Sequence, residues 1–194
     1  SKITSNEANA QNTDELIDSL CSQVYEYSNH GSGSQRKRAA LMQSYYYSTC
    51  DQFYRAREIL QLTNVQSVIQ TSEVSIQVLF NRAVVQLGLS AFRIGQIDEA
   101  RSILFEVATS NRIREVLGQG NNRSTQSNQP IQALTSEGET VTIGGERHVP
   151  FHMHINIQLL ETVYYITSLL IEIPLMALSC YQGKIGDNTE LWAQ

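Results

Sequence analysis

Apolar residues recur every three or four positions along most of this chain, the spacing that places them on one face of an α-helix. Polar or glycine-containing stretches separate these segments. The pattern predicts helices over 13–27, 35–48, 52–62, 74–94, 97–107, 113–117 and 155–173, with a further short helix from residue 175. The chain is therefore expected to be all-α.

The segment 74–94 is the strongest of these predictions. Its polar positions, which fall within an arc of roughly 80°, are Arg82, Gln86, Ser90 and Arg93. A helix with so narrow a polar strip is mostly covered by neighbours. Gly88 in its middle costs about 1 kcal/mol against alanine, which is tolerable where another helix crosses closely. Gly95 is expected to end the helix.

The segment 155–173 carries a polar stripe at spacings of three and four. The stripe comprises Gln158, Glu161, Tyr165, Ser168 and Glu172, and the apolar positions off it are Leu159, Leu160, Val163, Ile166, Leu170 and Ile173. This division predicts a buried amphipathic helix rather than a membrane span. Pro174 is expected to end or kink it.

An internal repeat suggests how the helices are arranged. Residues 51–60 (DQFYRAREIL) return 44 positions later as residues 95–104 (GQIDEARSIL), with five of ten residues identical. Self-similarity at a period of a few tens of residues is typical of stacked helical repeats, whose units bury their apolar faces against one another.

Small residues stand at matching positions of the two copies. Ala56 and Ala100 lie in the second helix of each pair, and Ser44 and Gly88 stand twelve positions before them. Small residues let helices cross closely. The spacing resembles a tetratricopeptide unit, although an offset of 44 residues exceeds the usual one of about 34. We therefore expect a right-handed, tetratricopeptide-like stack of antiparallel helical hairpins.

Composition divides the chain further. The expected parts are an N-terminal helix and linker (1–34), the hairpins (35–117), a flexible polar loop (118–150), a long helix and kinked short helix completing the same domain (151–182), and a tail (183–194). The loop is polar and of low complexity. Within it, residues 139–149 are expected to form a small β-hairpin around Gly144–Gly145.

Net charge and cysteine content indicate which kind of partner and which compartment to expect. The net charge is −5 and the pI about 5.4, whereas a nucleic-acid-binding domain usually has a basic balance. RNA is therefore not the default partner, and direct RNA contact stays open. Cys21, Cys50 and Cys180 are odd in number and far apart, which favours free, buried thiols in a reducing compartment such as the cytoplasm.

Three histidines, His148, His152 and His154, are weak candidates for a zinc site. Only Glu146 stands near enough in sequence to complete a ligand set, so packing or capping at the start of the next helix is the favoured interpretation. Gly118–Gln119–Gly120 follows a helix and lacks the Lys-Ser/Thr of a phosphate loop. No catalytic residue, metal or cofactor is therefore predicted.

Two clusters are candidates for binding a partner. Arg36, Lys37 and Arg38 place three positive charges at a helix start, against its dipole. They form either a solvated helix end or a contact with an acidic partner or a phosphate. The tyrosine triplet that begins at Tyr45 points around the same helix, so core packing and a partner-facing patch at Tyr45 and Tyr46 are both open.

Four stretches of the chain resemble one family. In order they are FYRAREIL (53–60), QVLFNRAVVQLGLSAFRIG (77–95), IREVLGQG (113–120) and VPFHMHINIQLLETVYYITSLLIEIPLMA (149–177). Together they resemble the c subunit of eukaryotic translation initiation factor three, and the P-F-H-x-H-I-N run is the most specific part of the match.

The resemblance implies a non-catalytic scaffold segment of helical repeats, in a subunit that continues into a winged-helix module. No winged-helix segment appears in this sequence. The implied partners are the other subunits of the initiation factor, the a subunit most of all, and the small ribosomal subunit, with no membrane. The loop 121–145 departs from the more charged segment expected in relatives.

Other functions stay open. The chain could be a scaffold of the proteasome-lid or signalosome type, built on the same helical plan. It could be a free-standing tetratricopeptide-like clamp for peptides, with Asn81 and Arg82 in its groove. A zinc enzyme built on the three histidines is the remaining hypothesis.

Overall fold

The computed structural model describes residues 2–27, 33–64, 69–120, 131–134, 140–143 and 149–190. Its helices are α1 (Lys2–Tyr27), α2 (Gly33–Thr49), α3 (Phe53–Thr63), α5 (Val74–Arg93), α6 (Ile97–Ala108), α7 (Ile113–Val116) and α8 (Ile157–Glu190). The short 3-10 turns are η2 (Ile69–Thr71) and η4 (Phe151–Met153). The expected all-α class is confirmed, apart from one small two-stranded ribbon.

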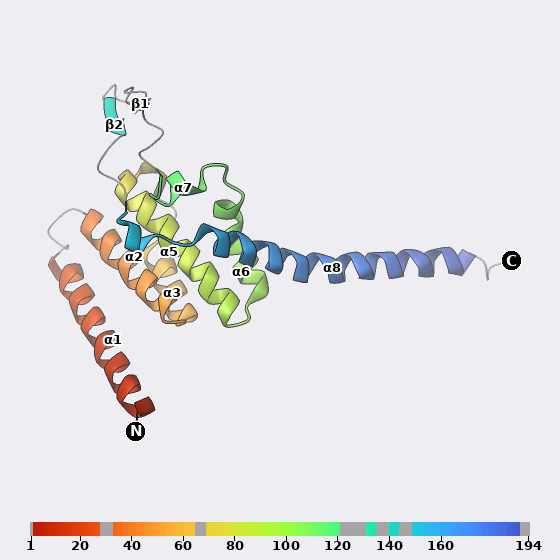
Figure 1. The fold of residues 1–194 in the computed structure, drawn as a ribbon, viewed down its shortest axis with the longest axis horizontal. Coiled ribbons are helices and arrows are strands. Elements are labelled where there is room, and N and C mark those ends of the chain that lie inside the picture. Colours follow the sequence, from red (N-terminus) through yellow and green to blue (C-terminus); the bar gives the residue numbers. More distant parts are fainter. Residues whose placement is uncertain are drawn as a thin grey trace.

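Two antiparallel hairpins, α2–α3 and α5–α6, pack side by side, and α5 is the central helix (Figure 1). α5 contacts α2 and α3 of the first hairpin as well as its own partner α6. α1 lies against α2 at one end of the stack. α8 packs along α6 at the other end and then projects away from the body (Figure 1).

The two hairpin turns are built alike, as the internal repeat leads one to expect. Asp51 and Gly95 stand in the turns with φ of 61° and 84°, the left-handed region that disfavours most side chains. The next amide donates back into the preceding helix in both copies. Gln52 donates to the Tyr47 carbonyl at 2.9 Å, and Gln96 donates to the equivalent carbonyl at 2.8 Å.

Gly88 lies where α5 crosses α6. A Cβ added there would stand 2.6 Å from Cγ of Leu104 and 3.2 Å from Cγ2 of Ile103, so the helices approach more closely than a side chain permits. At the equivalent position of the first hairpin, Ser44 is buried, and its hydroxyl donates to the Ala56 carbonyl at 3.0 Å. A small residue thus stands at each crossing.

Three apolar clusters make the core, and α5 contributes to all of them. The first lies between α5, α6 and the start of α8, and comprises Val85, Leu89, Leu104, Val107, Leu117, Ile155, Leu160 and Val163. The second joins the two hairpins through Tyr47, Phe53, Ala56, Leu87, Ala91 and Ala100. The third comprises Leu41, Ile76 and Ala83.

The ribbon consists of β1 (Ile131–Leu134) and β2 (Thr140–Ile143), paired antiparallel. The turn of the hairpin expected over 139–149, at Gly144–Gly145, lies outside the described residues. β2 ends before those glycines and pairs with a strand that precedes it. The consecutive β-branched residues of β2, alternately polar and apolar, indicate a strand, but they do not specify which neighbour the strand pairs with.

Buried polar contacts bring the chain back to the body after the ribbon. The Gln119 side-chain amide exchanges two hydrogen bonds with the backbone of Ile155, at 2.9 and 3.1 Å. Arg82 of α5, which is 3% exposed, donates to the carbonyls of Leu117, at 3.4 Å, and of Met153. We call these contacts the Arg82–Gln119 clasp. They fix the position from which α8 begins.

α8 differs most from its prediction. Leu160, Val163 and Thr167 are buried, but no side chain described beyond them, as far as Tyr181, is buried. The expected burial is wrong for Leu159, Ile166, Leu170 and Ile173, which are 40% to 58% exposed. α8 has 34 residues and α6 has 12, so at 1.5 Å per residue α8 is far longer than the helix that covers it.

Pro174 was expected to end or kink the helix; it lies inside α8 and does not end it. Proline cannot donate a hydrogen bond to the carbonyl of Leu170. This part of α8 is exposed, so water can satisfy that carbonyl. The leucine, methionine and alanine residues that follow favour a helix, and the helix continues.

α1 begins at Lys2, not near Thr13 where the apolar pattern starts. Residues 2–12 are mostly polar. A polar helical segment gives no periodic hydrophobic signal, so the apolar pattern could not predict the first turns of α1.

Within the described residues, two segments are long and apolar enough to cross a membrane, Val74–Arg93 and Phe151–Tyr181. The first is α5, the central helix, and 50% of it is buried inside the molecule, whereas 11% of the second is buried. Glu161 and Glu172 interrupt the second segment, and Glu172 pairs with Arg101 of α6. We therefore keep the prediction that neither spans a membrane.

We expect Gly88→Ala to lower the free energy of unfolding by about 1–3 kcal/mol, because the new Cβ overlaps Leu104. Urea denaturation measures this change. Leu104→Ala provides the matched background, since it removes the overlapping atoms and should make Gly88→Ala nearly neutral there. An equal cost in both backgrounds would contradict the close crossing.

We expect Arg82→Met to lower the free energy of unfolding by about 2–4 kcal/mol, because it leaves the carbonyls of Leu117 and Met153 without their donor. Arg101→Met is the control. It removes an exposed ion pair with Glu172 and should cost about 1 kcal/mol or less. Similar losses for the two variants in chemical denaturation would argue against the clasp.

Candidate functional site

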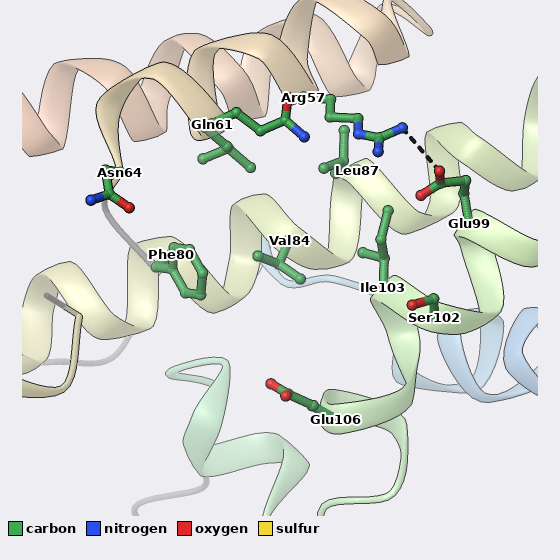
Figure 2. A pocket seen from close by; sticks show the side chains of 11 residues that line it. Arg57, Gln61, Asn64, Phe80, Val84, Leu87, Glu99, Ser102, Ile103 and Glu106 are labelled. Atoms are coloured by element: carbon green, nitrogen blue, oxygen red, sulfur yellow. Dashed lines mark hydrogen bonds and ion pairs between the residues drawn. The ribbon is translucent and has the colours of Figure 1, made fainter. Parts of the chain in front are cut away.

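α3, α5 and α6 enclose an open groove of about 520 Å³ (Figure 2). It is lined by Arg57, Leu60, Gln61, Asn64, Phe80, Val84, Leu87, Glu99, Ser102, Ile103 and Glu106. The side chains from the central α5 are all apolar, and most of those from α3 and α6 are polar. An apolar floor between polar walls suits a protein segment with an apolar side chain and polar flanks.

One ion pair crosses this groove. Arg57 Nη1 of α3 lies 2.9 Å from Glu99 Oε1 of α6 (Figure 2). The two side chains are 39% and 38% exposed, so the pair contributes about 1 kcal/mol or less. It links α3 of the first hairpin to α6 of the second. Glu106 stands apart from this pair (Figure 2) and has no ion-pair partner among the described residues.

The two residues expected to clamp a peptide do not line this groove. Asn81 Nδ2 donates to the Val116 carbonyl at 3.2 Å, and Arg82 belongs to the clasp, with its guanidinium 5.9 Å from the ring centroid of Tyr45. Both therefore hold the fold together. An arginine in the narrow polar strip of an apolar helix was the available sign, because a buried cation needs acceptors.

The basic residues at the start of α2 have partners inside the chain. Lys37 Nζ lies 3.3 Å from the hydroxyl of Ser72, and Arg38 pairs with Glu73 at 3.0 Å. The Arg36 guanidinium lies 5.7 Å from the centroid of a tyrosine ring of α1. These contacts offset three charges that oppose the helix dipole. A role for these residues in binding a partner stays a prediction.

Two carboxylates attach α1 to the body. Asp14 accepts a hydrogen bond from the hydroxyl of Tyr46 at 2.9 Å. Asp18 accepts hydrogen bonds from three donors on α2 and α3: Gln43, Tyr47 and Arg55. Tyr46 thus faces α1 in this structure, and its role as a partner-facing residue stays a prediction, as does that of Tyr45.

The contacts of α1 shift several pKa values. Burial raises the pKa of the Asp18 carboxyl, but hydrogen bonds from Tyr47 and Gln43 act against this. Together with the charge of Arg55 they bring the pKa below its ordinary value of 3.8. Burial, followed by the hydrogen bond to Asp18, raises the pKa of the Tyr47 hydroxyl, which therefore stays protonated and keeps donating.

The histidines do not come together as a metal site in the part of the chain that is described. His148 lies outside the described residues. His152 is exposed, and His154 Nε2 lies 2.9 Å from the Val149 carbonyl, with its ring against Phe151. No group of three potential metal ligands occurs among the described residues. His154 thus shapes the approach to α8.

All three cysteines are free. Cys21 is buried between α1 and α2, whereas Cys50 and Cys180 are exposed. The expectation of burial is wrong for these two, because Cys50 follows the last residues of α2 in a turn and Cys180 lies on the projecting part of α8.

The described elements define an all-α protein of packed helical hairpins with open apolar and polar surfaces. Comparison with known families identifies it further. The family model described as "Eukaryotic translation initiation factor 3 subunit 8 N-terminus" matches residues 1–182. The chain belongs to this family, which confirms the resemblance found in the sequence.

Curated relatives support this assignment. The C subunit of eukaryotic translation initiation factor 3 from Debaryomyces hansenii is 48% identical over 73% of this chain and 15% of that protein. The same subunit of Neosartorya fischeri is 41% identical over 88% of the chain and 19% of that protein. That of Phaeosphaeria nodorum is 39% identical over 94% and 20%. The chain therefore spans a fifth or less of the length of these relatives.

We expect Asp18→Asn to loosen α1, because an amide lacks the charge that holds the Arg55 guanidinium. Hydrogen–deuterium exchange at neutral pH should be faster over α1 in this variant. Glu15→Gln is the control, since Glu15 is exposed on the same helix. Equal exchange in the two variants would contradict an attachment through Asp18.

The same carboxylate makes the attachment of α1 sensitive to acid. The pKa of Asp18 is lowered in the folded chain, so its contribution to stability is complete above the ordinary value of 3.8 and is lost as the pH falls through the lower, folded value. Protection of α1 in the unmodified chain should therefore fall below pH 3.8.

Proposed function

We propose that this chain is a non-catalytic scaffold segment of a translation initiation factor, acting in the cytoplasm and binding other subunits of that factor. The a subunit is the foremost expected partner, and the assembled factor engages the small ribosomal subunit. Within the segment, α2–α3 and α5–α6 are tetratricopeptide-like hairpins of a right-handed stack. Membership of the initiation-factor family supports this proposal.

The observation that carries the proposal is the projecting part of α8. Seven large apolar side chains there are each more than half exposed: Leu169, Leu170, Ile173, Leu175, Met176, Leu178 and Tyr181. An apolar surface of this kind supports a role in protein–protein contact. This surface is exposed because α8 is much longer than α6, and no other described part of the body covers it.

The groove between α3, α5 and α6 favours a second candidate function, a clamp for a peptide segment. Its apolar floor and the acidic Glu106 would suit an apolar side chain followed by a basic one. The clamp and the scaffold are compatible, because the groove and the projecting part of α8 are different surfaces. The family match favours both over a scaffold of the proteasome-lid or signalosome type.

A pull-down from cytosolic extract tests the scaffold function. The tagged chain should retain initiation-factor subunits, the a subunit among them, and should do so after nuclease treatment. Leu170→Ser combined with Ile173→Ser should remove them, because both changes make the exposed face of α8 polar.

Glu58→Gln, an exposed change on α3, is the control and should retain the same subunits. Recovery of lid-type subunits instead, or of initiation-factor subunits only while RNA is intact, would count against the proposal.

A further inference from the structure

α1 is turned opposite to the usual orientation of an amphipathic helix. Its apolar side chains at spacings of four, four and three are Leu16, Leu20, Val24 and Tyr27, and their exposed fractions are 57%, 50%, 36% and 85%. At 100° per residue they fall within an arc of about 80°. We call these four residues the α1 stripe. It faces solvent, whereas such a stripe normally faces the core.

The opposite face of α1 holds the helix to the body. Asp14 and Asp18 lie there with their donors from α2 and α3, and Cys21 is the buried residue of this face. Tyr25 donates to Gln43 at 3.0 Å. These contacts fix the orientation of α1, so the α1 stripe is free to contact another molecule.

The charge of α1 narrows the choice of that molecule. Between residues 12 and 27 there are four acidic side chains and no lysine or arginine. Asp14 and Asp18 face the body, while Glu15 and Glu26 are exposed and lie about 80–100° from Leu16 on one side of the α1 stripe. In the described part of the chain neither of them has an ion-pair partner.

A second copy of this chain does not fit the α1 stripe. Two α1 helices would bring acidic edges together, which is unfavourable. The exposed face of α8 is no better, because residues 157–181 contain Glu161 and Glu172 and no lysine or arginine. A helix whose apolar face is bordered by basic residues complements both the apolar stripe and its acidic edge.

We propose that the α1 stripe docks an amphipathic helix of a partner protein, with apolar residues at heptad-like spacing and lysine or arginine along the edge that meets Glu15 and Glu26. This deepens the scaffold function, on which it rests for the assembly that supplies the helix. Packing of apolar side chains supplies affinity, and the charged edge sets orientation and partner choice.

Two synthetic helical peptides of 21 residues test this with the full chain, by fluorescence anisotropy. Both carry leucine at the first and fourth positions of each heptad. One carries lysine beside this seam, and the other carries glutamate at the same places. The lysine peptide should bind at least tenfold more tightly than the glutamate peptide, and its affinity should fall with added salt.

Three double variants test where on the chain the lysine peptide binds. Leu16→Ser with Leu20→Ser should weaken binding of the lysine peptide at least tenfold, whereas Met42→Ser with Leu62→Ser, exposed apolar side chains on α2 and α3, should leave it unchanged. Glu15→Gln with Glu26→Gln changes only exposed side chains and should reduce the preference for the lysine peptide. Circular dichroism melts check that each variant is folded.

Equal affinity for the two peptides, absence of binding, or binding that survives Leu16→Ser with Leu20→Ser would each overturn the proposal. A dimer in sedimentation that this double variant dissociates would do so too, because the occupant would then be a second copy. These outcomes leave the scaffold function intact if the chain still retains initiation-factor subunits, so the two proposals can fail separately.

Discussion

The placement of α8 depends on one buried guanidinium. Arg82 comes from the central helix and bonds to two carbonyls that stand on either side of the long segment between α7 and α8. Gln119 completes the junction with its paired hydrogen bonds to Ile155. A charge buried to this degree is unfavourable unless acceptors surround it. The clasp therefore closes the interrupted stack and sets the line along which α8 leaves the body.

Apolar side chains are covered in the interior of the fold and exposed at its two ends. In the interior, α5 packs on both sides and supplies residues to all three apolar clusters. At the ends, apolar surface faces outward, on the α1 stripe at one end and along α8 at the other. A unit of a stacked fold buries its face only when a neighbour covers it. Surface of this kind would serve the scaffold function proposed above.

Much of the interior could be predicted from the sequence, because its pattern is local. The period of α5, the small residue Gly88 at a crossing, and the turn at Gly95 each have a signature within a few residues. The burial of Arg82 could not be predicted, since its acceptors lie 35 and 71 positions further along the chain. The course of α8 beyond Pro174 depends on exposure, which local sequence does not record.

The sequence also could not show which face of α1 meets the body. Its leucine spacing indicates an apolar face, but spacing cannot show whether that face meets the body or solvent. The donors that decide the question, among them Tyr47 and Arg55, are on other helices and act on Asp18. Since the carboxylates and the α1 stripe lie on opposite faces, α1 can stay attached to the body while its apolar face contacts a partner. The carboxylates that attach α1 to the body and the α1 stripe can therefore be mutated separately, each without removing the other.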